Sequence, residues 1–463
     1  MKRKVTRRKA ISTIAAAGSV VGVGIGAGLV GYFVGSTAAP VATTVTRTVT
    51  ATETVARPPK EVPQKPLKIG ITVYLSGPLS ITGIDAFNGA KIAVKWLNEG
   101  NVPGLGKLKY KGILGREIQL VSFDETTGAD AILSAVRRMV SEDNIELLIG
   151  PVSSANNIAL VPVIEKELQL PTIATYGGSY RIFEEVNPNP VYFFSATYDG
   201  HNPVGIAQWL AKTYPTLKKI AVINPDFAYG RDTWTLFREA FLKLVPGAEV
   251  VGESWPTLGS PDFTPNITAA LAWGADLIYT VLFAGDAVTF FKQATALGLH
   301  KRSKIVAQSY QQYWAFTKEI LPEGIIMTPN YYFPDTPPKY HMNTALVKES
   351  VAMFGQPAGD SADHVFSAVM AFKTAIEAAY ELTGEYPDNK QIARTLERIS
   401  FETPAGVKLF DKYSHRMRAP LIIGETKHRP DTPYPVLDPI YAVPSEQSLP
   451  IGGQKVLEWI RSW

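Results

Sequence analysis

The stretch KIGITVYLSGPLSITGIDAFNGAKIAVKWLN, which runs from Lys68 to Asn98, decides the fold of this chain. It predicts a buried strand over Ile69–Leu75, a turn rich in Gly, Pro, Ser and Thr over Ser76–Gly83, and then an amphipathic helix. The apolar residues of that helix lie three and four positions apart on one face: Phe87, Ala90, Val94 and Leu97. The strand lacks a strict alternation of apolar and polar residues, which is typical of a parallel strand covered on both faces. Because open α/β sheets bind ligands beyond the carboxyl ends of their strands, the turn predicts a small-molecule site.

Strand and helix patterns alternate along the rest of the chain in two sets. The first set has strands at Ile118–Phe123, Leu147–Ile149, Thr172–Ala174 and Val191–Ser195. The second has strands at Lys219–Ile223, Glu249–Ser254, Leu277–Phe283, Lys304–Ala307 and Ile325–Pro329. Such alternation predicts an α/β fold with parallel sheets, here in two Rossmann-like lobes with a cleft between them. We expect lobe 1 to comprise residues 67–195 plus 328–401, and lobe 2 to comprise residues 196–327 plus 402–463.

The composition is that of a globular protein, with 46% hydrophobic and 19% charged residues among 463, which is enough chain for two domains. The net charge is +4, but six positive charges lie in the first nine residues, which leaves about −2 for the rest. The basic charge is therefore local, and nothing indicates a nucleic-acid partner. The absence of cysteine excludes disulfides, thiolate metal sites, a cysteine nucleophile and a lipid-modified cysteine anchor.

Residues 1–36 are interpreted as an export signal or membrane anchor. Thr6-Arg7-Arg8-Lys9-Ala10-Ile11 resembles a twin-arginine signal, and the apolar run from Ala10 to Val34 is long enough for a transmembrane helix. The basic residues before this run predict a cytoplasmic N-terminus. Two alternatives stay open: a retained anchor, which the length favours, or a signal cut at Thr37-Ala38-Ala39, where Pro40 would hinder processing. In both, the folded region is expected outside the cytoplasm, and an anchor would tether it to the membrane.

Residues 37–66 are interpreted as a stalk. The sequence is rich in threonine and then in proline, as in TTVTRTVTATETVARPPKEVPQKP. Such sequence cannot build a core and is expected to stay extended, which would hold the folded region away from the membrane. A threonine-rich β-strand is the alternative.

No local catalytic pattern stands out in the sequence. GxxxxGK[ST], HExxH and GxSxG are all absent, and the histidines are scattered without metal-ligand spacing: His201, His300, His341, His364, His415 and His428. Asp124-Glu125 follows a strand and is interpreted as a base, an ion site, a helix cap or a solvated turn. The sequence thus favours a binding protein over an enzyme, with no metal and no cofactor expected, although a triad need not be local.

Hydroxyls, glycines and aromatic residues follow the predicted strands. Ser153-Ser154 lies at a strand-to-helix turn, where hydroxyls and free N–H groups suit a carboxylate, although helix capping by Ser154 explains it equally well. Tyr176-Gly177-Gly178-Ser179 follows the next strand, and Tyr229, Phe283 and Tyr310 follow strands of the second set. Each aromatic residue alone fits a core position, but their occurrence at equivalent positions in both sets predicts the wall of an organic-ligand pocket.

These motifs, in order, resemble the type I solute-binding proteins of branched-chain amino acid ABC transporters (leucine/isoleucine/valine-binding-protein-like) over about residues 67–427. The motifs that carry the resemblance are Leu75-Ser76-Gly77-Pro78, Leu114-Gly115-Arg116, Ile149-Gly150-Pro151-Val152-Ser153-Ser154, Pro171-Thr172-Ile173, Asp226-Phe227-Ala228-Tyr229-Gly230-Arg231, Lys292-Gln293-Ala294 and Phe366-Ser367-Ala368-Val369. The resemblance implies two Rossmann-like lobes joined by three crossovers that close on a ligand. It also implies that Ser153, Ser154, Tyr176 and Gly178 hold a ligand carboxylate, with Ser179 as a further hydroxyl.

From lobe 2, the resemblance implies that Tyr229 and Phe283 close over the ligand and that an acid near Tyr310 pairs with an α-ammonium. The sequence departs from the family here, because Gln308–Gln312 contains no acid and Thr82 stands where an aromatic residue is common. A buried ammonium without a counter-charge is costly, so these departures permit a neutral or anionic ligand.

The resulting expectation is an exported, membrane-tethered receptor of an ABC importer. It would capture a small organic solute, such as a branched-chain or other amino acid, an amide or a small carboxylate, and deliver it to the permease subunits. The alternative is a ligand-sensing module that works with a separate signalling partner.

Overall fold

The computed structural model describes residues 61–176, 178–196, 201–309, 312–329, 341–450 and 452–463. The predicted signal or anchor at residues 1–36 and most of the stalk at residues 37–66 therefore lie outside the described residues. Within the described part of the chain, no helix has both the length and the apolar character needed to cross a membrane.

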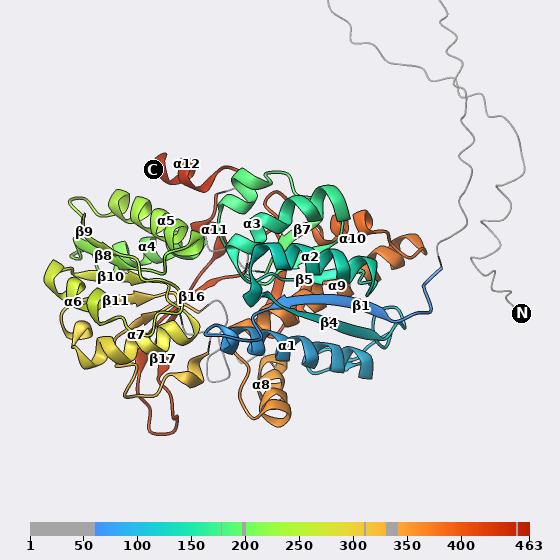
Figure 1. The fold of residues 1–463 in the computed structure, drawn as a ribbon, viewed down its shortest axis with the longest axis horizontal. Coiled ribbons are helices and arrows are strands. Elements are labelled where there is room, and N and C mark those ends of the chain that lie inside the picture. The colour runs from blue at the N-terminus through green and yellow to red at the C-terminus, as the bar shows by residue number, and fades with distance from the viewer. Residues whose placement is uncertain (1–60, 177, 197–200, 310–311, 330–340, 451) are drawn as a thin grey trace, which may run out of the picture. The chain divides into compact units, whose positions relative to one another are not determined.

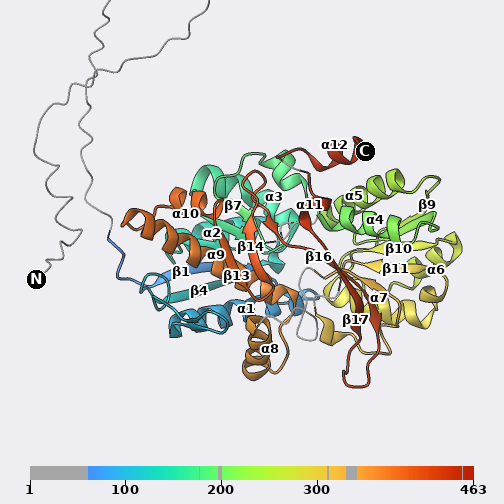
Figure 2. The same cartoon turned by 180° about the vertical axis from the view of Figure 1, so that it is seen from behind.

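The first sheet has five parallel strands in the order β4-β1-β5-β6-β7. These are β1 (Leu67–Val73), β4 (Ile118–Asp124), β5 (Leu147–Ile149), β6 (Thr172–Ala174) and β7 (Phe193–Ser195). Its helices are α1 (Ser80–Glu99), α2 (Ala129–Ser141), α3 (Ser154–Val163), α8 (His341–Phe354), α9 (Asp360–Thr383) and α10 (Asn389–Leu396). Helices α2 and α3 pack together on one face, and α1 packs along α9 on the other (Figures 1 and 2). We call this sheet with its helices lobe 1.

The second sheet has seven strands in the order β17-β16-β12-β11-β10-β8-β9. These are β8 (Lys219–Ile223), β9 (Glu249–Ser254), β10 (Leu277–Thr280), β11 (Lys304–Ala307), β12 (Ile326–Met327), β16 (Leu421–Lys427) and β17 (Val436–Val443). Its helices are α4 (His201–Thr213), α5 (Ala228–Leu244), α6 (Thr264–Trp273), α7 (Ala284–Ala296), α11 (Ser445–Ser448) and α12 (Val456–Arg461). The sheet is mostly parallel, as the alternating pattern predicts, and β16 and β17 add an antiparallel edge. We call this sheet with its helices lobe 2.

Burial on both faces explains why the strands read as continuous apolar runs. Within β10, Leu277 and Tyr279 enter one core of lobe 2 while Ile278 enters the other. Strand β8 divides in the same way, since Ile220 and Val222 face the first core and Ala221 and Ile223 face the second. Because helices cover both faces of the sheet, neither face meets solvent. A polar side chain at every second position of a strand would therefore be buried without a hydrogen-bond partner.

A three-stranded antiparallel sheet shows where the chain crosses from lobe 1 to lobe 2 for the last time. It consists of β13 (Ser400–Thr403), β14 (Gly406–Phe410) and β15 (Met417–Arg418). Phe401, Phe410 and Met417 are buried in the lobe 1 core, and Ser195 at the end of β7 bridges to Arg416. The chain therefore stays with lobe 1 until it enters β16, which is later than the predicted boundary between residues 401 and 402.

Several shorter elements complete the chain. They include a hairpin of β2 (Asn101–Val102) and β3 (Gly106–Lys107). There are also short 3-10 helices, η2 (Glu125–Thr127), η5 (Leu299–Lys301) and η6 (Tyr313–Ala315), and short π-helices, η3 (Ile164–Leu168) and η4 (Ile182–Val186). The first predicted turn is shorter than expected, because α1 begins at Ser80 and not after Gly83.

Candidate functional site

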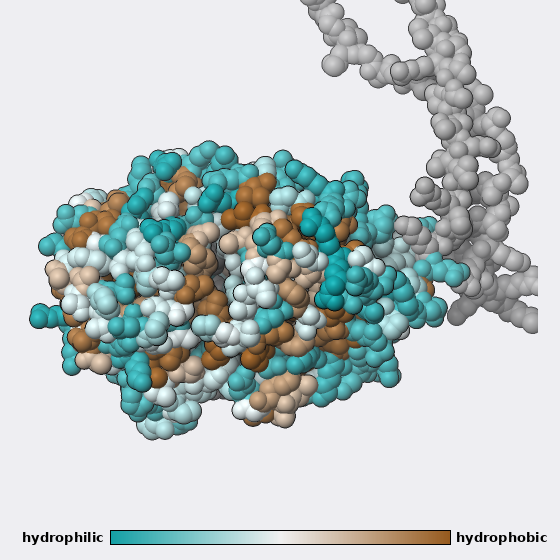
Figure 3. Space-filling view, in the orientation of Figure 1, coloured by the Kyte–Doolittle hydropathy of each residue, from teal (hydrophilic) through white to brown (hydrophobic). Residues whose placement is uncertain are grey.

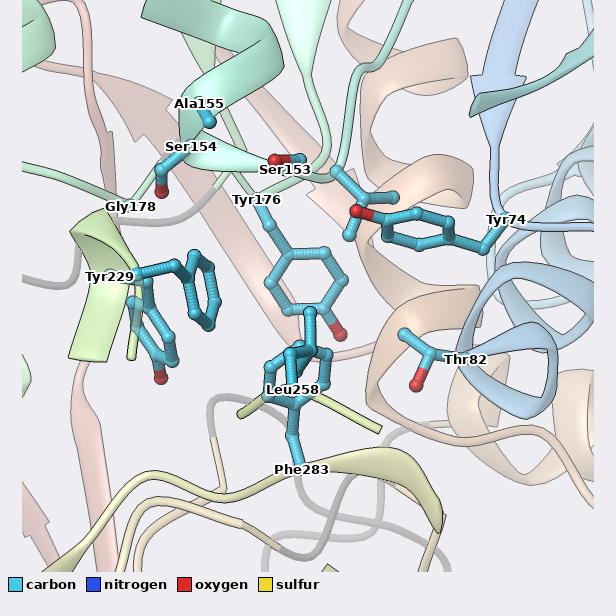
Figure 4. Close-up of a pocket in the computed structure, with 12 residues that line it drawn as sticks. Tyr74, Thr82, Ser153, Ser154, Ala155, Tyr176, Gly178, Tyr229, Leu258 and Phe283 are labelled. Carbon is cyan, nitrogen blue, oxygen red and sulfur yellow. The ribbon is translucent and has the colours of Figure 1, made fainter. Parts of the chain in front are cut away.

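A cavity of about 200 Å³ lies between lobe 1 and lobe 2, at the carboxyl ends of strands from both sheets. We call it the interlobe cavity. Lobe 1 contributes Tyr74, Thr82, Val152, Ser153, Ser154, Ala155, Tyr176 and Gly178, and lobe 2 contributes Phe227, Tyr229, Leu258 and Phe283. Figure 3 shows a hollow near the middle of this face with hydrophobic residues along its edges, and Figure 4 shows the lining side chains. An engineered apolar cavity of about 150 Å³ holds benzene, so this volume suits a ligand of single-ring or amino-acid size.

The amino end of α3 supplies hydrogen-bond donors to the cavity. Ser153 is the N-cap of this helix, since its Oγ accepts from the Asn156 N–H at 3.4 Å and its backbone is extended. Ser154 is the first helical residue and is 4% exposed; within the described residues its hydroxyl makes no hydrogen bond. Figure 4 shows this hydroxyl directed into the cavity toward Tyr229. The N–H groups of Ser154 and Ala155 are in the first turn of α3, where no carbonyl of a preceding helical turn is present to accept from them. This end of the helix therefore suits a carboxylate or another acceptor-rich group.

A buried carboxylate lies behind the same wall. Glu125, in η2, is 1% exposed and accepts the N–H groups of Val152 and Ser153, each at 3.0 Å. Burial raises the pKa of Glu125 to about 8, although these hydrogen bonds act in the opposite direction. Burial, followed by the charge of Glu125, raises the pKa of the nearby Tyr74 above its usual range. The sequence suggested free N–H groups throughout this turn, but those of Val152 and Ser153 are already bonded.

The neighbouring Asp124 has a different role. Its carboxylate accepts the N–H of Thr126 at 3.1 Å and the hydroxyl of Ser76 at 2.6 Å, and it caps η2. Partial burial is the largest single contribution and raises the pKa of Asp124, but the hydrogen bonds together outweigh it and lower the pKa to about 2. Of the interpretations left open for Asp124-Glu125, helix capping describes Asp124, and none of them anticipated that Glu125 is buried.

Three aromatic rings of lobe 2 form the apolar wall. The centroids of Phe227 and Tyr229 are 5.9 Å apart, and those of Tyr229 and Phe283 are 6.2 Å apart with the rings nearly perpendicular. Leu258 continues this wall, and Tyr176 faces it from lobe 1 (Figure 4). Edge-to-face packing of this kind holds the rings in fixed orientations, so the wall is preformed.

A chain of hydrogen bonds connects the two lobes beside the cavity. Gln312, which precedes η6 in lobe 2, accepts from the Thr82 hydroxyl at 3.2 Å and donates to the Ser361 hydroxyl at 3.0 Å. Ser361 in turn is 2.8 Å from the hydroxyl of Tyr176. Gln312 is only 3% exposed, so this amide lies inside the interface between the lobes. Thr82 is therefore a lining residue whose hydroxyl already has a partner.

Two further predicted residues have other positions. Ser179 is outside the cavity wall: it is 2% exposed and its hydroxyl donates to Asp232 of α5, which is a contact between the lobes. Tyr310 lies outside the described residues. The structure brings the other predicted residues together around one cavity: Thr82, Ser153, Ser154, Tyr176, Gly178, Tyr229 and Phe283.

The sequence-based site omitted five lining residues, which are Tyr74, Val152, Ala155, Phe227 and Leu258. Tyr74, Val152 and Phe227 directly follow or lie within the loops that follow β1, β5 and β8, so the rule that selected Ser153 would have found them. Leu258 lies in the loop after β9, so the same rule extends to it. Within the described residues, no group of three His, Cys, Asp or Glu side chains could hold a metal ion.

Comparison with known proteins agrees with this architecture. A model of the family "periplasmic binding protein" matches residues 66–431. The chain belongs to this family. Among curated relatives of this periplasmic binding protein, the Leu/Ile/Val-binding protein homolog 7 of Brucella suis is 29% identical over 247 residues. That alignment covers 52% of this chain and 58% of the relative, so the match spans little more than half of the relative's length.

Solved structures of periplasmic binding proteins share the fold. A solute-binding protein of an ABC transporter from Rhodopseudomonas palustris, in complex with 3,4-dihydroxybenzoic acid, has a TM-score of 0.68 at 20% identity. The match covers 82% of this chain and 98% of that protein. A leucine-binding protein from Thermotoga maritima has a TM-score of 0.65 at 19% identity, covering 82% of this chain and 99% of that protein. At this level of identity the likeness concerns the fold alone.

Proposed function

We propose that this protein is the solute receptor of an ABC importer, which captures a small organic molecule in the interlobe cavity and delivers it to permease subunits. The observation that carries the proposal is a cavity whose wall is shared between the two lobes. A ligand held there contacts donors of lobe 1 and aromatic rings of lobe 2 at once, so its binding energy favours approach of the lobes. The closed form would be the one that the permease recognises. The protein would act by binding and not by catalysis.

The proposed contacts divide by lobe. Ser154, Ser153 and the backbone at Gly178 would receive the polar group of the ligand, with Tyr176 and Thr82 beside it. Tyr229 and Phe283 would cover its apolar part. Ser179 would act indirectly, through its bond to Asp232 across the lobes. Tyr310 remains a predicted contact from its position after β11.

The proposed location is outside the cytoplasm. The twin-arginine-like signal and apolar run in residues 1–36 support export, and a retained run would tether the protein to the membrane through the stalk at residues 37–66. The lobe division is proposed as residues 67–195 plus 328–401 for lobe 1 and 196–327 plus 402–463 for lobe 2, with the core packing favouring a later final boundary.

Similar proteins support a small organic ligand. Relatives are named for leucine, isoleucine and valine, and one structural neighbour holds 3,4-dihydroxybenzoic acid. These ligands are comparable in size, and each carries a carboxylate on a compact hydrocarbon chain or an aromatic ring. We infer the same general size and shape for the ligand of this chain.

A thermal-shift panel tests this function. The full chain is heated with amino acids, amides and carboxylates, each at a concentration about 100-fold above a typical micromolar Kd, at which a specific ligand adds about 2.7 kcal/mol of stability. We expect a clear rise in Tm with at least one compound. Mass spectrometry of small molecules that copurify provides an independent readout. No stabilisation by any compound, together with no copurified solute, would contradict the proposal.

A further inference from the structure

The interlobe cavity has no charged group in its described wall. The lining residues with polar side chains are all hydroxyl-bearing: Tyr74, Thr82, Ser153, Ser154, Tyr176 and Tyr229. The other side chains of this lining are apolar or aromatic. The residues that follow β11, where the family resemblance implies an acid, are Gln308, Ser309, Tyr310, Gln311 and Gln312. A ligand that enters with a positive charge would therefore meet no negative partner among the lining residues that the structure describes.

The buried carboxylates around the cavity already have partners. Glu125 accepts two N–H groups behind Ser153, and Asp85, one turn after Thr82, accepts those of Gly359 at 3.0 Å and Ala362 at 3.2 Å. In lobe 2, Asp286 accepts the N–H of Gly259 at 2.9 Å. Asp232 accepts from Ser179 next to Gly178, and Asp360, which precedes Ser361, lies 2.8 Å from the His364 ring nitrogen. Turning any of these toward an ammonium would leave a buried donor of the protein unpaired, which is costly.

The amino end of α3 has the opposite character. Ser154 is buried, its hydroxyl points into the cavity, and it makes no hydrogen bond within the described residues. The N–H groups of Ser154 and Ala155 lie at the positive end of the helix dipole. The two N–H groups can only donate and the hydroxyl can donate as well, so a single carboxylate of the ligand can accept from all three.

The opposite side of the cavity suits a flat or branched apolar group. Phe227, Tyr229 and Phe283 pack against one another and, with Leu258, leave a hydrophobic face across from Ser154. A primary ammonium placed here keeps three N–H donors that need acceptors, whereas a ring or branched chain needs none.

We propose that the ligand is a small monocarboxylate with a ring-sized apolar body and no α-ammonium, bound with its carboxylate at Ser154 and Ala155 and its body against Phe227, Tyr229 and Phe283. This inference rests on the proposed function, and it narrows the solute to one chemical class. The protein then discriminates against amino acids because the described wall offers no negative charge to offset the desolvation of their ammonium group.

Matched ligands test the inference by calorimetric titration of the full chain. The pairs are 3-phenylpropionate with L-phenylalanine, and 4-methylpentanoate with L-leucine, which differ in the α-ammonium but keep the same body. Benzoate serves as a ring without a linker. We expect at least one acid to bind, and to bind at least about 100-fold more tightly than its amino acid. Equal or tighter binding of the amino acids would overturn the inference and leave the proposed function intact.

Two additional probes separate the parts of the inference. 3-Phenylpropanamide keeps the body but removes the negative charge, and we expect it to bind at least about tenfold more weakly than the acid. Equal affinity would overturn the assignment of a carboxylate to α3. Glycine betaine carries a quaternary ammonium that aromatic faces can hold, so its binding in preference to every acid would also overturn the inference. Failure of all these probes and of the thermal-shift panel would instead contradict the proposed function.

Discussion

At the scale of single residues, two adjacent serines have separable roles. Ser153 caps α3, whereas Ser154 faces the cavity without a partner in the described residues. We expect Ser153→Ala to lower the free energy of unfolding of the ligand-free protein by about 1 kcal/mol. Ser154→Ala should leave that stability nearly unchanged and weaken binding of the best acid by about tenfold, because one hydrogen bond to a charged group is lost. Urea unfolding and calorimetric titration measure the two effects.

Ser350→Ala is the matched control for these serines. Ser350 is equally buried, but it lies in α8 and bonds to the backbone of Gln356. The Ser350→Ala variant should have a lower free energy of unfolding than the unmodified protein and the same affinity for the ligand. If Ser154→Ala instead destabilises the ligand-free protein as much as Ser153→Ala does and leaves affinity unchanged, the serine is part of the cap and not of the site.

Because of Glu125 and Asp85, we expect the free energy of unfolding to decline as pH rises. In the folded protein burial raises the pKa of Glu125 to about 8 and that of Asp85 to about 7, above their ordinary values of 4.5 and 3.8. The folded state therefore keeps protons that the unfolded chain has already released. Their contribution to the free energy of unfolding is fully present below about pH 4 and is lost as pH rises toward 8, by at most about 1.4 kcal/mol per pH unit for each group.

Urea unfolding at several pH values between about 5 and 8 measures this decline. Glu125→Gln removes one titrating group, so we expect the decline to become shallower. Asp124→Asn is the control: the pKa of Asp124 is about 2, so its loss should change stability without changing the slope in this range. A Glu125→Gln variant with the slope of the unmodified protein would show that Glu125 is ionised throughout.

At the scale of elements, the close packing of α1 on α9 depends on one glycine. A Cβ at Gly89 would lie 2.2 Å from the backbone oxygen of Ala362, and this backbone cannot move without shifting α9. Helix propensity alone predicts that Gly89→Ala stabilises α1 by up to about 1 kcal/mol. We expect a net loss of about 2 kcal/mol instead, because overpacking separates the helices.

Thermal or urea unfolding of the ligand-free protein measures the effect of Gly89→Ala. Ile84→Ala provides a comparison on the same helix, since Ile84 is 40% exposed and should cost less. A stabilised Gly89→Ala variant would show that α1 and α9 have room to adjust.

The elements that sequence reasoning predicted are those with local signals. Apolar runs and helical spacing located β1, β5, β8 and α5, because parallel strands and their crossover helices have patterns that can be read in a short window. The antiparallel edge of lobe 2 was not predicted, because strand direction depends on which neighbour a strand meets and not on its own residues. The late passage into β16 was missed for the same reason: Phe410 and Met417 look like any strand residues until their core is known.

The candidate site shows a similar division. The rule that ligands lie beyond strand ends placed Ser153, Ser154, Tyr229 and Phe283 around one cavity. The rule could not show that the Glu125 carboxylate accepts hydrogen bonds from two N–H groups of the same turn. Glu125 is 27 residues before Val152, so this contact depends on how η2 and β5 are placed in three dimensions.

At the scale of the whole molecule, several described contacts join the lobes beside the cavity. Gln312 joins Thr82 and Ser361, Ser179 bonds to Asp232, and the turn of Pro78 lies against Gly259. These contacts are absent from either lobe alone, so their free energy contributes only when the lobes are together. They therefore set how readily the cavity closes, while Ser154 and the aromatic wall determine what it holds.

Gln312→Ala should separate closure from recognition. The variant loses two hydrogen bonds between the lobes, one of them to the lining residue Thr82, but Gln312 itself is not among the described lining residues. We therefore expect every ligand to bind about five- to tenfold more weakly. The ratio of affinities between 3-phenylpropionate and 3-phenylpropanamide should stay the same, whereas Ser154→Ala should reduce that ratio. Calorimetric titration gives the affinities, and small-angle X-ray scattering of the ligand-free variant should show a larger radius of gyration. Gln119→Ala, an exposed change on β4, is the control. If Gln312→Ala altered the ratio and left the radius unchanged, Gln312 would belong to ligand recognition, because only a group that senses the ligand can change its selectivity.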